Sequence, residues 1–468
     1  MFQIRIDNQN VDLQPGMVIT LNRFNPVFDF DVIQGSKVYD FTLPFSPRNN
    51  RIFGYLNEPA VAWESRDFIC EKYADAELIE RGVIQVKQVT NEGYSVIYTQ
   101  NLGEVFGDFQ KLPLNLIDFG SEAIPGVLPS APDHLTAKYC FPMVHNPGFY
   151  VAPIPGTYAN YVNHYTGGAY TATSPKVPFL YLRWVLEKIG ELCNFTFEGD
   201  FVTDATMKRL IFYNTFSLDG RTTIEYRNHL PALTIPDLLK ELRKLFNLAL
   251  FFDVRSRVLK MNYVDTHLAE PTILNWSRKF APVANRAPES ANRLELDWEL
   301  DGGDGLMKVR PADYEKYTSA GTGLLFPIKT RFSSPEVDGS DRIKAEQPGI
   351  SPTNNQLNNG FGPRLAFWSG VVGGIPTASN THGTYRLAWH GDNNLVARFW
   401  AGFEAFKIGT FRRVMLGDLT ATDIALIDMH RRAGQTMAVH IHGRDYLIGN
   451  QRINLPLQGV SELELWAR

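Results

Sequence analysis

Short runs in which apolar and polar residues alternate dominate the first 120 or so residues of this 468-residue chain. Each run is bounded by turn-forming residues, as in FQIRID, VITLN, FDFDVI, VYDFTLPF, GVIQVKQVT and GYSVIYTQN. Alternation of this kind places one face of a strand in a core and the other face outside. Short strands with turns between them favour a small antiparallel barrel or sandwich. We therefore predict an N-terminal β-barrel-like domain over residues 1–125.

The stretch from Gly35 to Asn57, GSKVYDFTLPFSPRNNRIFGYLN, shows how such a strand stops. Its strand residues alternate roughly: Val38, Phe41, Leu43 and Phe45. Pro44 and Pro47 have no backbone N–H to donate to a ladder, so the strand ends there or lies at a sheet edge. The residues Arg48–Arg51 then predict a polar turn.

The middle of the chain, residues 126–295, combines a long loop with helices and hairpins. Residues 121–175 are rich in Tyr, Gly, Pro and Asn and have no period, so we expect an ordered loop that lies on a surface of its own or a neighbouring chain. Two amphipathic helices follow, near 178–193 and 234–246. The second has one apolar stripe, formed by Leu238, Leu239, Leu242, Leu245 and Phe246. Each helix runs into strand-like sequence, which predicts an α+β domain whose helices pack on a sheet.

The last part, residues 296–468, returns to strand signals after loop-rich sequence over 300–362. One short helix is expected in LTATDIALIDMHRRAG, where Thr420 and Asp423 have capping-box spacing. The predicted fold class is therefore mainly β with an α+β middle, with small antiparallel β-barrel or sandwich domains at both ends and two amphipathic helices with hairpins between them.

Composition limits the kinds of function. The 46 basic and 50 acidic residues give a net charge of −4, which argues against a basic surface that grips nucleic acid. The three cysteines have no CxxC spacing, so we expect reduced, packed thiols. No apolar run reaches the roughly 18 residues that span a bilayer, and the N-terminus MFQIRIDNQN has no apolar core typical of a signal peptide. We expect maturation in a reducing cytoplasm.

Candidate metal sites have plainer interpretations. Asp301–Gly305 and Asp338–Asp341 resemble calcium loops but lack the further acidic positions of an EF-hand, so turns are favoured over calcium. His440 and His442 share one face of a strand but have no evident third ligand. GxSxG, HExxH, P-loop and GxGxxG motifs are absent from the sequence. We predict no metal, no cofactor and no catalytic residue.

One block near the N-terminus resembles tail-hub proteins, the baseplate or tail-tip hubs of Bacteroidota tailed phages and prophages. It has an aromatic-x-Leu-Pro strand end, an Asn-containing turn and then Ile-Phe-Gly, matched by Phe41, Leu43, Pro44, Asn49, Asn50, Ile52, Phe53 and Gly54. Further blocks follow in the same order, in VPFLYLRWVLEKIGELCNFTFEGDF, TIPDLLKELRKLFNLALFFDVRSRVLKM, RLAFWSGV, YRLAWHG and LTATDIALIDMHRRAGQTMAVHIHGRDYLI. Each block is low in specificity, and the resemblance rests on their shared order.

The resemblance implies a structural virion protein similar to the contractile-tail baseplate hub. Such hubs are homotrimers with two small β-barrels per subunit, arranged as a pseudo-sixfold ring that continues the tail tube to the tip or spike. The implied partners are the tail-tube protein, the tip or spike, other baseplate proteins and the tape-measure protein, with the genome passing through the lumen. The implied location is the tail tip or baseplate of the virion, after synthesis in the bacterial host cytoplasm. No similarity between the two β regions is visible in this sequence, so the two-barrel count comes from the resemblance alone.

The subunit interface is predicted in two places. The strand end and the polar turn can stop sheet growth and offer donors to a neighbour, or they form an ordinary hairpin exit. The aromatic loop can pack between subunits. The predicted interface residues are Phe45, Arg48, Asn49, Asn50, Arg51, Tyr150, Tyr158 and Tyr161.

Two other functions remain open from the sequence. A β-sandwich tail appendage that binds or hydrolyses carbohydrate would use exposed tyrosines of residues 150–170 for stacking on sugars. A bacterial surface adhesin is disfavoured by the missing signal peptide. Specific nucleic-acid binding and a membrane span are not expected in any of these.

Overall fold

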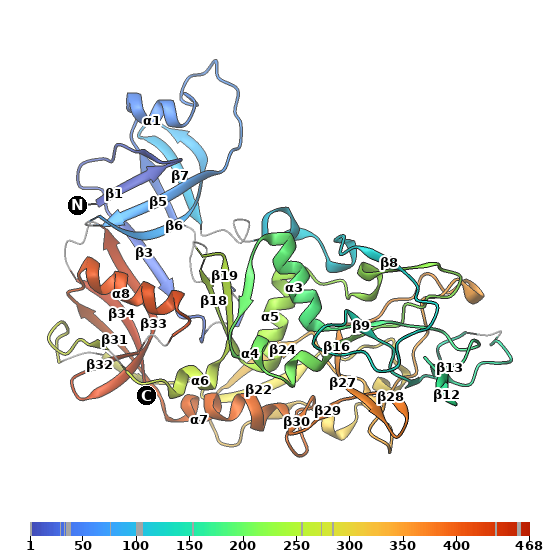
Figure 1. Cartoon of the computed structure of the whole chain (residues 1–468). Helices are drawn as coiled ribbons and strands as arrows, with labels where there is room; N and C mark the ends of the chain where they lie inside the picture. The colour runs from blue at the N-terminus through green and yellow to red at the C-terminus, as the bar shows by residue number, and fades with distance from the viewer. Residues whose placement is uncertain are drawn as a thin grey trace.

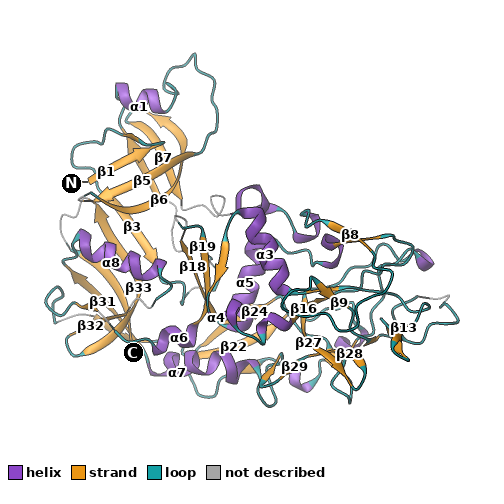
Figure 2. Ribbon diagram, viewed as in Figure 1, coloured by secondary structure: helices purple, strands orange, loops and turns teal. Residues whose placement is uncertain are grey.

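The computed structural model of the chain confirms a mainly β fold with a mixed α/β middle (Figures 1 and 2). In the described part of the chain, no helix is both long enough and apolar enough to cross a bilayer. All three cysteines are free and buried, as predicted. The described residues are 2–28, 30–31, 33, 39–74, 76–99, 106–151, 154–253, 256–272, 274–282, 285–435, 438–455 and 460–468.

The N-terminal unit is an antiparallel sheet curled around its own core, with the strand order β2-β1-β5-β6-β7-β4. Alternation places Phe41 and Leu43 in this core and leaves Asp40 exposed, as predicted. Val38, which the sequence also assigns to this strand, lies outside the described residues. The strands are β1 (Phe2–Ile6), β2 (Gln9–Asn10), β4 (Tyr39–Leu43), β5 (Phe68–Ala74), β6 (Glu77–Thr90) and β7 (Gly93–Thr99).

Strand β4 ends at Leu43 and lies at the edge of the sheet, so both expectations for Pro44 are met. The residues that follow form the short helix α1 (Pro47–Ile52), where a turn was predicted. The helix forms because the Ser46 side chain accepts a hydrogen bond from the N–H of Asn49, and Pro47 suits a first helical position.

The C-terminal sheet takes strands from distant parts of the chain, in the order β20-β32-β33-β34-β31-β21. Strand β3 (Ile19–Phe24) leaves the N-terminal unit and pairs with β33, from Ile19 opposite Leu455 to Phe24 opposite Asn450. The other strands are β20 (Leu274–Asn275), β21 (Asn285–Pro288), β31 (Phe411–Gly417), β32 (Ala438–Ile441), β33 (Arg444–Leu455) and β34 (Ser461–Ala467).

A small apolar cluster joins the two β units. It contains Leu21 of β3, Ile79 of β6, Ile453 of β33 and Ile424 of α8 (Ala421–Arg432). The capping box predicted at Thr420 and Asp423 begins this helix. The helix and β3 therefore hold the two sheets together at one seam.

The middle of the molecule contains the largest hydrophobic cluster, which extends from Val27 to Phe403. Helix α5 (Ile235–Phe246) buries its predicted stripe completely and packs on β18 (Leu248–Asp253) and β24 (Leu325–Thr330). Helix α3 (Leu182–Cys193) packs on β15 (Thr196–Glu198) and β16 (Leu210–Tyr213). Both helices thus cover strands, as their single apolar stripes predict.

The remaining elements are short. The strands are β8 (Ser121–Ala123), β9 (Tyr139–Cys140), β10 (Val144–His145), β11 (Tyr161–Val162), β12 (Tyr165–Thr166), β13 (Ala169–Tyr170), β14 (Phe179–Leu180), β17 (Thr223–Glu225), β19 (Val258–Tyr263), β22 (Arg293–Trp298), β23 (Tyr317–Thr318), β25 (Glu336–Val337), β26 (Ile343–Lys344), β27 (Arg364–Val372), β28 (Ile375–Ser379), β29 (Thr381–His382) and β30 (Tyr385–Arg386). The helices are α4 (Asp200–Thr203), α6 (Val264–Ala269), α7 (Ala401–Gly409) and a π-helical turn at Val396–Trp400. Turns of 3₁₀ helix occur at Gly107–Lys111, Leu114–Leu116, Met207–Arg209, Tyr226–His229, Gly305–Lys308, Ala312–Tyr314 and Thr353–Asn355.

The hydrophobic clusters combine residues from distant parts of the sequence. The middle cluster includes Leu294 of β22 and Phe367 of β27, while the C-terminal cluster includes Trp276. The division into three domains at residues 125 and 295 stays a prediction.

Candidate assembly surfaces

The strand end at Phe45 presents an aromatic ring to solvent. Phe45 follows Pro44, and its residue surface is 40% exposed. The edge of the ring packs on Tyr94, with 5.2 Å between the ring centroids. One side of the ring is therefore held by the N-terminal core and the other is available to a partner.

Asn49 belongs to the interior of the unit. Its side-chain amide donates to the carbonyl oxygens of Asp12 and Pro44 at 2.9 and 2.8 Å, and its amide oxygen accepts from the N–H of Asp12 at 2.9 Å. The residue is fully buried. These bonds fasten the end of β4 to the loop that contains Asp12, so the Asn49 side chain is already occupied within the chain.

The neighbouring polar side chains divide between inside and outside. Arg48 forms a 2.7 Å ion pair with Asp12, and more than half of its side-chain surface is exposed. The amide oxygen of Asn50 accepts a hydrogen bond from the Tyr94 hydroxyl at 3.1 Å. Arg51 is exposed on the last turn of α1. Phe45, Arg48 and Arg51 can reach another molecule, and their place in an interface stays a prediction.

The aromatic loop lies on its own chain. Tyr150 is buried, and its hydroxyl donates to the Asp219 carboxylate at 2.7 Å. Its ring meets Tyr158 edge to face at 5.0 Å, and the Tyr158 hydroxyl donates to the carbonyl of Asn146. Burial, with the adjacent negative charge of Asp219, raises the pKa of Tyr150 far above its usual value, and burial does the same for the pKa of Tyr158. Both rings are part of the fold of the subunit.

Tyr161 has a different environment. Its ring lies between two imidazoles, with centroid distances of 5.1 Å to His145 and 5.6 Å to His164. It is half-buried, so part of the ring remains accessible. Of the three tyrosines predicted for the interface, Tyr161 is the one placed to meet a partner.

The first Asp-Gly loop holds an arginine. Asp304 is fully buried, and it accepts from Arg364 at 2.6 Å and from the N–H groups of Leu306 and Glu346. Asp301 lies 3.6 Å from the same guanidinium and accepts from Gln347 and Gly362. Burial alone would raise the pKa of Asp301, but the Arg364 charge and these hydrogen bonds lower it below the usual range. The guanidinium supplies the positive charge that a cation would have supplied.

The other candidate metal residues have partners within the protein. Asp338 accepts from the N–H groups of Ser340 and Arg342, as in a plain turn. His440 bonds to Asp445 at 2.7 Å, and His442 bonds to the carbonyl of Phe280 at 2.8 Å. Among the described residues, no group of three His, Cys, Asp or Glu side chains converges on a common point.

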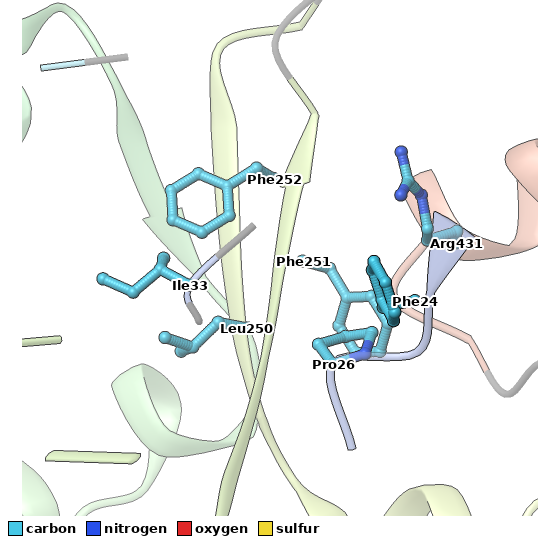
Figure 3. Close-up of a pocket in the computed structure, with 7 residues that line it drawn as sticks. All are labelled: Phe24, Pro26, Ile33, Leu250, Phe251, Phe252 and Arg431. Atoms are coloured by element: carbon cyan, nitrogen blue, oxygen red, sulfur yellow. The ribbon is translucent and has the colours of Figure 1, made fainter. Parts of the chain in front are cut away.

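A small pocket marks the place where β3, the β18 hairpin strand and α8 meet (Figure 3). Phe24 and Pro26 lie on the same side of β18 as Phe251 and Arg431, while Phe252 and Ile33 lie on the other side. The cavity measures about 20 Å³, which is room for little more than a water molecule. It is a packing defect at a junction and not a substrate site.

Two of the three arginines that are buried in the described chain, Arg23 and Arg364, were not predicted from the sequence. Arg23 lies on the same face of β3 as Ile19 and Leu21, and it is 4% exposed. Its guanidinium donates to the carbonyl of Ile79 and lies 3.7 Å from Asp428 of α8. Arg364 opens the apolar strand β27 and is fully buried. The alternation of β3 places Arg23 on its buried face, whereas no local pattern signals the burial of Arg364, because the groups that cover it come from distant segments.

No protein-family model and no curated protein sequence matches the chain. Three solved structures cover 99% of it at low similarity. The 43 kDa tail protein of prophage MuSo2 from Shewanella oneidensis has 9% identity and a TM-score of 0.38, with 95% of that chain covered. The tail protein from Neisseria meningitidis MC58 has 10% identity and a TM-score of 0.39, also with 95% covered. The prophage tail protein gp18 from Listeria monocytogenes EGD-e has 7% identity and a TM-score of 0.34, with 94% covered. Similarity at this level does not by itself assign a fold or a function.

Proposed function

We propose that the chain is a non-enzymatic structural protein of a phage tail, three copies of which form a hub that continues the tail tube toward the tip or spike. The observation that carries this proposal is the pair of largely antiparallel β units, each with its own core, joined at one seam by β3 and α8. Three subunits with two such units each supply the six β units of a pseudo-sixfold ring. The shared order of the sequence blocks that resemble tail hubs supports the same assignment.

The outward faces of the two β units carry paired charges. On the N-terminal sheet, Lys87 lies 3.1 Å from Asp40. On the C-terminal sheet, Arg412 lies 2.9 Å from Glu464. Affinity for duplex DNA grows with the number of phosphates that unpaired Lys and Arg neutralise. A lumen lined by such faces lets the genome pass without sticking.

The partners in this proposal are the tail-tube protein on one side and the tip, the spike or other baseplate proteins on the other, with the tape-measure protein in the lumen. A carbohydrate-binding appendage is the competing function. It depended on exposed tyrosines in residues 150–170, but the rings of Tyr150 and Tyr158 are packed within the subunit. Neither of these two rings is free to stack on a sugar.

The test is the mass of the purified protein in solution and its place in a purified tail. We expect a mass three times that of the chain and density on the tail axis at the junction between tube and tip. A well-folded monomer at micromolar concentration, with no position on the axis of any tail, would exclude the hub.

A further inference from the structure

A projecting loop in the N-terminal unit gathers exposed apolar side chains. The chain leaves α1, forms the loop Tyr55–Asp67 and returns as β5 (Figure 1). We call this loop the Trp63 arm. Every residue from Glu58 to Asp67 is exposed. The arm rises above the N-terminal sheet, clear of α3 (Figures 1 and 2), and its two ends are bonded to the same unit through Asn57 and Arg66.

Trp63 is unlike the other tryptophans of the chain. It is 51% exposed, and its ring makes no contact with another aromatic ring among the described residues. Of the eight tryptophans, Trp466 is half-buried against Phe28 and the remaining ones, Trp63 apart, are buried. Tyr55 and Val61 of the arm are also exposed, and Phe45 lies just before α1, from which the arm starts. Exposed aromatic anchors on a protrusion are typical of hot spots that a partner buries.

The charge of the arm restricts the partner. Three carboxylates, Glu58, Glu64 and Asp67, stand against one guanidinium, Arg66, so the arm is acidic. Arg66 also pairs with Asp7 at 3.1 Å. An acidic arm is repelled by an anionic lipid surface. The arm therefore fits a protein recess with an apolar floor and basic groups at its rim.

The same chain presents a recess of this kind along α3. The groove has a volume of about 700 Å³ and is open to solvent along the helix and the strand that follows it. Its rim contains Arg183 and Arg257, together with Glu187 and Glu191. Arg183 pairs with Glu187 at 2.6 Å and Lys188 pairs with Glu191, so the rim offers both guanidinium groups to acidic side chains and carboxylates to an indole N–H. The floor is apolar and aromatic, formed by Leu186, Phe195, Phe197 and Val202.

We propose that the Trp63 arm of one subunit inserts into the α3 groove of a neighbouring copy of this chain. The indole ring packs on Phe195 and Phe197, and its N–H donates to the carboxylate of Glu187 or Glu191. Glu58 and Glu64 then lie against the basic side of the rim. This contact rests on the proposed trimer and names the surfaces that join its subunits.

The first experiment compares the mass of variants over a range of concentrations. Trp63→Ala should raise the dissociation constant of the trimer by about 30-fold or more, the loss expected of a hot-spot residue. Its melting temperature in the monomeric state should match the parent, because the side chain is exposed. Val372→Ala, on the exposed tip of the β27–β28 hairpin, is the matched control and should assemble like the parent.

The second experiment fills or bridges the groove. Thr196→Trp and Glu187→Trp, both at exposed positions of the groove, should each weaken assembly as Trp63→Ala does. Glu187 lies on the surface of α3, so its variant tests the proposal even if the β15 variant fails to fold. With Val61→Cys and Thr196→Cys in one chain, a bismaleimide should link subunits, while the parent should not react because its cysteines are buried.

The outcomes separate the contact from the hub. A parent trimer that Trp63→Ala leaves unchanged, or that the cysteine pair does not cross-link, overturns the arm contact and leaves the hub standing. A parent that stays monomeric overturns both. Binding to vesicles of phosphatidylcholine and phosphatidylglycerol that disappears in Trp63→Ala overturns the contact in favour of a lipid surface.

Discussion

At the end of β4, Phe45 leaves much of its ring in solvent, whereas Tyr150, in the aromatic loop after β10, buries its ring and bonds its hydroxyl to Asp219. Both residues come from segments that combine aromatic residues with Pro and Asn. The difference is that residues 343–356 lie against the aromatic loop, while no segment of the described chain covers Phe45. Composition therefore indicates that the aromatic side chains of a segment pack against another surface. The rest of the fold determines whether that surface belongs to the same chain or to a partner.

The largest expected effect is the loss of stability on truncating Tyr150. Tyr150→Ala removes a buried aromatic ring and leaves Asp219 without its 2.7 Å donor. We expect a loss of about 3–5 kcal/mol in the free energy of unfolding. Phe45→Ala is the matched change on the exposed side and should cost about 1 kcal/mol or less. Denaturant unfolding of the two variants measures both, and equal losses would remove the distinction between the two segments.

The next largest effect distinguishes two neighbouring side chains in the segment that follows β4, Asn49 and Asn50. Asn49→Ala leaves the carbonyl oxygens of Asp12 and Pro44 without their donor inside the unit. We expect a cost of about 1–3 kcal/mol. Asn50→Ala should cost less, because the Tyr94 hydroxyl has one proton and its shorter contact, at 2.6 Å, is with the amide oxygen of Asn57. Thermal melting measures both variants. If Asn49→Ala leaves the melting temperature unchanged and Asn50→Ala lowers it, Asn49 is not the residue that holds this segment to the interior of the unit.

Alkaline pH should destabilise the aromatic loop. Burial raises the pKa of Tyr150 in the folded state, while the unfolded chain ionises this tyrosine near pH 10. The stabilisation is complete below pH 10 and is lost as the pH rises further, by about 1 kcal/mol between pH 10 and 11 for this residue. Unfolding experiments at these two pH values should show a smaller loss for Tyr150→Phe than for the parent. An identical loss would mean that Tyr150 ionises freely in the folded protein.

The smallest expected effect is on DNA. Arg48 and Arg51 are exposed, but Arg48 is paired with Asp12, so the segment is not a phosphate-binding site. We expect negligible binding of fluorescent duplex DNA at physiological salt, with no change in the double variant Arg48→Ala, Arg51→Ala. Submicromolar affinity with a steep salt dependence that the double variant abolishes would contradict both the interface role of this segment and the proposed lumen.

Local sequence patterns correctly predicted the elements whose structure depends on residues close in the sequence. The alternation around Phe41, the apolar stripe of α5 and the capping box at Thr420 each appear in the structure. Helix α1 was missed because its polar residues are typical of a turn, and only the Ser46 cap and Pro47 distinguish it. At this length the cap outweighs propensity.

Long-range burial could not be predicted. Arg23 shares the buried face of β3 with Ile19 and Leu21, and the groups that partner its guanidinium there, the carbonyl of Ile79 and the carboxylate of Asp428, come from distant segments. Asp301 and Asp304 were assigned to plain turns, and the sequence gives no sign that Arg364, 60 residues from Asp304, would be their partner. The exposure of Trp63 was missed for the opposite reason, since a tryptophan in a short loop is normally expected to be buried.

The pairing of β3 with β33 affects folding during translation, because the two strands are far apart in the sequence. Thr20 of β3 bonds to Asn454 of β33, 434 residues later in the chain. At about 5–20 residues per second, the ribosome needs roughly 20–90 s to make the partner of a strand that has already emerged. During that time β3 offers an unpaired edge and the apolar side chain of Leu21 to every other nascent chain nearby. Neighbouring ribosomes on one message carry identical β3 strands, so residues translated much later decide whether β3 stays soluble.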